Sequence, residues 1–110
     1  MLFSTDVWVA ALIRRVELGG GFAVVARKGD ARAGAVLIKV LNRTDGTARL
    51  YAEATRLDGE TVWMQPAASQ DEPDLDRYIE RAARIDPDLW VVEIEDRQGR
   101  HFLTEAVEKG

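Results

Sequence analysis

The residues best suited to binding chemistry lie in a short basic loop. Arg27, Lys28 and Arg32 stand close to Asp30, with Gly29 among them. Cationic side chains and turned-out backbone N–H groups can together hold an anion. The loop therefore predicts an anion-binding site made of Arg27, Lys28, Asp30 and Arg32. The other interpretation is a solvated connection between strands, in which glycine only allows the chain to turn.

A second group of chemically interesting residues lies near the C-terminus. Glu93, Glu95 and Asp96 bring carboxylates together, and His101 is the only histidine. Paired carboxylates can do acid–base work or bind a hard cation. However, no nucleophile accompanies His101 in the sequence, and no histidine pair has metal-ligand spacing. We therefore predict no catalytic residue, no metal site and no cofactor, and the sequence leaves open whether the protein is an enzyme.

Aromatic residues suggest a different kind of site. Trp90 alternates with apolar neighbours and is predicted to be core. Trp8 lies off the main apolar stripe of its segment, and Trp63 faces away from the side chains next to it. Because exposed tryptophan is enriched at interfaces, we predict that Trp8, Trp63 and Tyr51 contact a partner. The alternative is a wide apolar stripe and a second apolar sheet face.

The net charge of −4 argues against a nucleic-acid-binding protein. Residues 1–56 hold nine Lys or Arg and five Asp or Glu, whereas residues 57–110 hold six and fourteen. This asymmetry indicates either an anion-binding face or two halves that neutralise each other on packing. Tyr51 could join Trp63 across the predicted hairpin, near Arg49 and Arg56. This group is too sparse a base-stacking platform to predict RNA binding.

Length and composition predict one globular domain over residues 1–110. The apolar run 7–13 follows Asp6 and precedes two arginines, which is the wrong polarity for a signal peptide. No run approaches the ~18–20 apolar residues of a membrane span. The chain has no cysteine, which suits a reducing compartment. We therefore expect a cytoplasmic protein without a membrane segment.

Hydrophobic periodicity predicts the elements. Val9, Leu12, Ile13 and Val16 form a helical stripe, and the glycines at 19–21 end that helix. Alternation predicts a strand over 22–27, and the run 35–41, apolar on both faces apart from Lys39, predicts a central strand. The turn signals Asp45-Gly46 and Asp58-Gly59 predict returning strands over 47–55 and 60–65.

The second half predicts a helix over 72–85, a strand over 89–95, a short returning strand over 101–103 and a frayed end over 104–110. The order αββββαββ favours an α+β fold, with two helices packed on an antiparallel β-meander.

Three stretches resemble a known family. They are VWVAALIRR at 7–15, GGFAVVARKGD at 20–30 and DPDLWVVEIEDR at 86–97. They are similar to domain-of-unknown-function family 1491, a family of short bacterial proteins. The resemblance covers nearly the whole chain and implies a bacterial cytosolic protein of about this length, but no activity, ligand or catalytic residue.

Taken together, the residues predict a small cytoplasmic interaction module that binds a protein partner or itself. The alternative is a module that binds a phosphorylated small molecule or an RNA backbone through the loop from Arg27 to Arg32.

Overall fold

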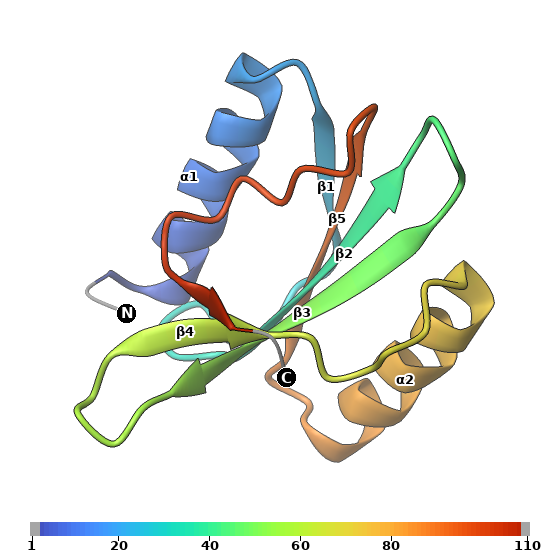
Figure 1. The fold of residues 1–110 in the computed structure, drawn as a ribbon. Helices are drawn as coiled ribbons and strands as arrows, with labels where there is room; N and C mark the ends of the chain where they lie inside the picture. The colour runs from blue at the N-terminus through green and yellow to red at the C-terminus, as the bar shows by residue number, and fades with distance from the viewer. Residues whose placement is uncertain (1–2, 109–110) are drawn as a thin grey trace.

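The computed structural model describes residues 3–108, which form two helices and one six-stranded sheet (Figure 1). The helices are α1 (Thr5–Leu18) and α2 (Glu72–Ile85). The strands are β1 (Phe22–Arg27), β2 (Val36–Asn42), β3 (Ala48–Thr55), β4 (Thr61–Met64), β5 (Trp90–Asp96) and β6 (Val107–Glu108). The predicted α+β class is therefore confirmed.

The sheet is mixed, so the predicted antiparallel meander is wrong. Its strand order is β1-β5-β2-β3-β4-β6, with β5 inserted between β1 and β2. β5 runs parallel to β2, and β6 runs parallel to β4, while the other neighbours are antiparallel. Strand β2 is central, as predicted. It is apolar on both sides because both of its faces are covered.

The hairpins β2–β3 and β3–β4 turn at Gly46 and Gly59, which have φ of 75° and 87°. This backbone conformation favours glycine, which explains why the Asp-Gly pairs predicted these turns correctly.

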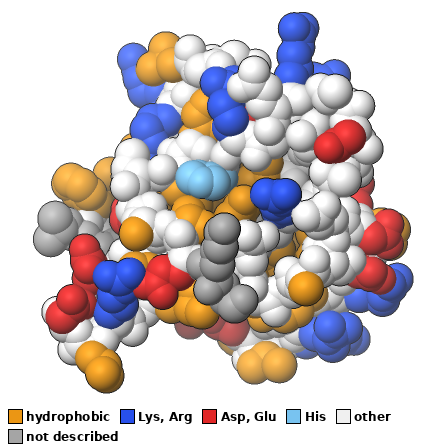
Figure 2. Space-filling model, in the orientation of Figure 1, with side chains coloured by type: hydrophobic (Ala, Val, Ile, Leu, Met, Phe, Trp, Pro, Cys, Tyr) orange, Lys and Arg blue, Asp and Glu red, His pale blue; other side chains and the backbone are white. Residues whose placement is uncertain are grey.

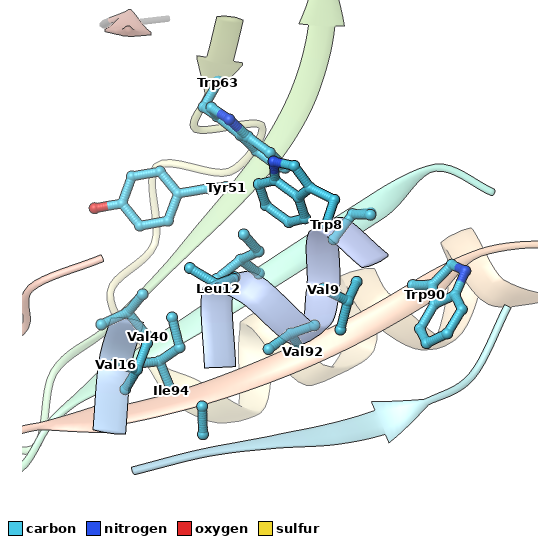
Figure 3. Packing of buried hydrophobic residues seen from close by; sticks show 13 residues of the cluster. Trp8, Val9, Leu12, Val16, Val40, Tyr51, Trp63, Trp90, Val92 and Ile94 are labelled. Carbon is cyan, nitrogen blue, oxygen red and sulfur yellow. The ribbon is translucent and has the colours of Figure 1, made fainter. Parts of the chain in front are cut away.

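Each face of the sheet carries its own core (Figure 1). On one face, α1 packs Val9, Leu12 and Val16 against the sheet, and Figure 3 shows this cluster with Val92 and Ile94 of β5. On the other face, α2 buries Leu75 over the apolar side chains of β2, β3 and β5. Alternate residues of the central strands thus serve opposite cores.

A buried lysine fastens α2 to the sheet. Lys39 of β2 is 4% exposed, and its Nζ lies 2.8 Å from Glu72, 2.7 Å from Asp76 and 3.2 Å from Glu93. Burial alone would lower the pKa of Lys39. The hydrogen bonds to Asp76 and Glu72 and the charge of Glu93 outweigh burial and raise that pKa. Here a cation from residues 1–56 is neutralised by carboxylates from residues 57–110.

The C-terminal segment differs from prediction. Residues 101–103 form no strand, and Phe102 has φ of 60°, a conformation that interrupts strand geometry. The strand that does form is β6, inside the segment expected to fray. It forms there because Val107 packs against the core of the α1 face. Residues 109 and 110 of the predicted frayed end lie outside the described residues.

Neither helix within residues 3–108 combines the length and the apolar character that crossing a membrane requires.

Candidate functional site

The aromatic residues predicted as an exposed interface are buried. Trp8 is 6% exposed, Trp63 0% and Tyr51 3%, and all three belong to the core on the α1 face. Trp8 and Trp63 stack with ring centroids 5.2 Å apart, whereas Tyr51 meets His101 edge to face. In the β3–β4 hairpin, the residue directly opposite Trp63 is Glu53 and not Tyr51. The prediction that these rings are exposed is wrong, because the second apolar face of the sheet is covered by α1.

A single carboxylate joins the two stacked tryptophans. The indole N–H of Trp8 donates to Oε2 of Glu105 at 3.3 Å, and that of Trp63 donates to Oε1 at 3.2 Å. Figure 3 shows the two indole nitrogens side by side, with Trp90 far from them. Glu105 thus satisfies two donors that burial would otherwise leave unpaired. Glu105 has no signal in the sequence, because the segment that carries it has no hydrophobic period.

A groove of about 810 Å³ opens beside this pair. One wall is the outer side of α1 and the residue stretch before it, and the other is the turn between β3 and β4 together with the first residue of β4. The C-terminal segment forms the floor. The lining residues are Phe3, Val7, Trp8, Ala11, Arg15, Gly59, Glu60, Thr61, Thr104, Glu105 and Ala106. This volume is in the range of binding pockets for small molecules or peptide side chains.

The wall formed by α1 is apolar and exposed. Phe3 precedes α1, whereas Val7 and Ala11 have four-residue spacing within the helix and therefore lie on one side of it. Phe3 is 66% exposed and Val7 is 52% exposed, although both belong to large apolar types. The core stripe of α1 lies elsewhere on the helix, so this second stripe contributes little to holding α1 on the sheet.

The basic loop predicted to bind an anion braces the N-terminus of α1. The carbonyl of Arg32 accepts the backbone N–H of Thr5, and the carbonyl of Ala31 accepts that of Asp6. Asp30 accepts the N–H groups of Arg32 and Ala33 at 3.2 and 2.9 Å. The donors that would turn toward an anion therefore bond within the loop.

The cations of that loop do not converge on one point. Arg27 donates to the carbonyl of Pro87 at 3.2 Å, whereas Lys28 and Arg32 are exposed. Gly34 is needed for close packing, because a Cβ there would come within 2.3 Å of the Asp88 carbonyl oxygen. The geometry supports the second interpretation of the sequence, a connection between strands.

A polar depression of about 340 Å³ lies between the glycines at 19–21 and the end of β5. Arg43, Arg97 and Arg100 line it, together with Glu95 and Asp96. Arg100 bonds the buried Asp96 through two guanidinium nitrogens, at 2.8 and 3.1 Å. These bonds, with backbone N–H groups, lower the pKa of Asp96 to about 2. The three arginines exceed the two carboxylates by one charge, and the guanidinium group of Arg100 is already paired with Asp96.

Two of the carboxylates considered as catalytic groups are paired with cations in the structure. Glu93 contacts Lys39, and Asp96 contacts Arg100. His101 accepts the backbone N–H of Leu103 at Nδ1, and burial lowers the pKa of its imidazole. Figure 2 shows this histidine near the centre of one molecular face, with apolar side chains next to it. Within residues 3–108, no group of three His, Cys, Asp or Glu side chains could hold a metal ion.

Comparison with other proteins identifies relatives. The model of the family "Protein of unknown function (DUF1491)" matches residues 3–104. A crystal structure of a DUF1491 family protein from Caulobacter crescentus CB15 is 77% identical, with a TM-score of 0.96, covering 97% of this chain and all of that chain.

A more distant relative keeps the same fold. The solution structure of protein Atu0922 from A. tumefaciens is 34% identical, with a TM-score of 0.83 and 98% of both chains covered. No curated protein matches the chain in sequence.

Proposed function

Since this chain belongs to the DUF1491 family, to which no function is assigned, we propose a function from its geometry: it is an interaction module that binds a segment of a partner protein in the groove beside α1. The observation that carries the proposal is the exposed stripe of Phe3 and Val7 above that groove. Exposed apolar side chains grouped along a concave surface are typical of binding sites for other proteins.

The groove also indicates the chemistry of the partner. Its apolar wall suits aliphatic or aromatic side chains. Two carboxylates, Glu60 and Glu105, outnumber the single cation Arg15 in the lining, although Glu60 already pairs with Arg56 outside it. The chain as a whole carries a net charge of −4. A segment that combines apolar side chains with lysine or arginine therefore complements both the shape and the charge of the groove.

The proposal is tested by selecting peptides from a displayed random library on the immobilised protein. We expect enrichment of apolar peptides with a basic residue, and we expect Val7→Asp to abolish their binding. The matched control is Val24→Asp, which places the same change on an exposed valine of β1, away from the groove. If no peptide is enriched, or if both variants bind the enriched peptides as well as the wild type, the groove is not the binding site.

We further propose that the protein acts in the cytoplasm. Its lack of cysteine suits a reducing compartment. Fractionation of the cells that encode the chain would test this proposal. Recovery of the protein with secreted or envelope fractions would contradict it.

A further inference from the structure

The two edges of the sheet are built differently. At one edge, β6 contains only two residues, Val107 and Glu108, so it offers little backbone for pairing. At the other edge, β1 extends over six residues and, among the strands of residues 3–108, pairs with β5 alone. Figure 1 shows β1 at the margin of the sheet, with no strand beyond it. Short or charged edge strands prevent sheets from joining, and β1 is neither short nor charged before Arg27.

The side chains of β1 are apolar and exposed. Phe22, Val24 and Val25 are between 39% and 54% exposed, whereas Ala23 is buried beneath α1. Phe22 and Val24 lie opposite Glu95 and Glu93 of β5, and therefore on the face of the sheet that carries α2.

That face is open above β1, because α2 packs over β2 and β3. Free backbone groups and apolar side chains thus occur together on one strand.

We propose that β1 pairs with β1 of a second copy of this chain, in antiparallel orientation, so that two sheets join into one. An antiparallel pair related by a two-fold axis places each residue opposite a residue of the same sheet face. A pairing centred on Val24 sets Val24 against Val24 of the second copy and Ala23 against Val25, within the part of β1 that pairs regularly with β5. All of these side chains are apolar.

The charge pattern fits a second copy better than it fits a charged peptide. Residues 22–26 carry no charge, so like charges never oppose each other along the pair. The irregularity between Val25 and Arg27 in the β1–β5 pairing ends the regular ladder just before the first cation. The β1 edge and the groove beside α1 share no residue, so the proposal is independent of the proposed function.

The absence of cysteine allows a direct test by disulfide trapping. Opposed residues of antiparallel strands have Cα atoms about 4.5–5.5 Å apart, within disulfide range. Under mild oxidation, Val24→Cys should convert to a covalent dimer at least tenfold faster than Leu57→Cys. Leu57 is fully exposed at the turn after β3 and serves as the matched control.

The wild-type mass in solution provides a second test. Light scattering should give a species of twice 12.3 kDa at high protein concentration, and Val24→Lys should return the mass to that of one chain. Because Val24 is exposed, we expect Val24→Lys to keep the wild-type fold, and circular dichroism checks this. A wild-type monomer at millimolar concentration, or equal trapping of the two cysteine variants, would overturn the proposal.

Discussion

Removing the charge of Lys39 tests whether this buried lysine holds α2 to the sheet. The substitution Lys39→Met deletes the ammonium group and keeps a flexible apolar stem of similar length, so packing within β2 changes little. The three carboxylates that meet Nζ then lose their common partner and face one another. We expect the free energy of unfolding to fall.

The size of the fall follows from the exposure of the partners. Breaking a fully buried ion pair costs about 3–5 kcal/mol. Here the lysine side chain is 5% exposed, but Glu72, Asp76 and Glu93 are 38–49% exposed and regain water once the lysine is gone. The partial return of hydration places the expected loss at about 3 kcal/mol, the low end of that range.

Urea unfolding at pH 7, followed by circular dichroism, measures the loss. Because the pKa of Lys39 is raised above its ordinary 10.5 in the folded state, its contribution is complete below pH 10.5 and the loss should be the same at pH 7 and pH 9. The control is Arg14→Met on the exposed side of α1, with an expected change below about 0.5 kcal/mol. If both variants change stability equally, the reasoning about Lys39 is refuted.

Three further predictions concern other parts of the fold. Asp96→Asn should lower the free energy of unfolding by about 2 kcal/mol at pH 7, because the folded pKa of Asp96 is about 2, below its ordinary 3.8. The wild type should therefore lose this extra stability as the pH falls from 3.8 toward 2. Urea titrations of both proteins at several pH values measure the difference. Burial lowers the pKa of His101, so wild-type stability should decline as pH falls below 6.5, and His101→Leu should flatten that decline; an unchanged slope would exclude His101 as its source. Gly34→Ala should lower stability by about 2 kcal/mol in thermal or urea unfolding, because its Cβ would meet the Asp88 carbonyl, and a neutral result would contradict the close packing described.

Local signals in the sequence predicted most elements. The apolar stripe and acidic start of α2 predicted the helix over 72–85 that is observed, and alternation predicted β1 over 22–27. The Asp-Gly turns set both hairpins. These features depend on residues close together in the chain, and so their pattern is visible without the fold.

The strand order could not be predicted, because it depends on contacts between distant segments. β5 lies beside β2 in the sheet, although β5 begins 48 residues after β2 ends. Nothing in the alternation of β5 distinguishes a central from an edge position. The one warning sign was Lys39, the only charged residue of an otherwise apolar strand. Such a position requires carboxylates from another element to cover it.

The site was predicted only in part. Trp8 was predicted as an exposed interface residue; it lines the groove, but from a buried position. Its burial depends on Trp63 and on Glu105, which lie 55 and 97 residues away in sequence. The exposed residues Val7 and Ala11 have helical spacing and could have been found, but the core stripe of α1 is stronger.

The most direct test of peptide binding in the groove is the NMR signal of the three indole N–H groups, assigned with single Trp→Phe variants. Trp8 and Trp63 donate to Glu105 at the groove, whereas Trp90 donates to the Asp30 carbonyl at a distant point. On titration with a selected apolar, basic peptide, the account predicts that the signals of Trp8 and Trp63 shift while that of Trp90 stays. A shift of Trp90 alone, or no shift at saturating peptide, would contradict it.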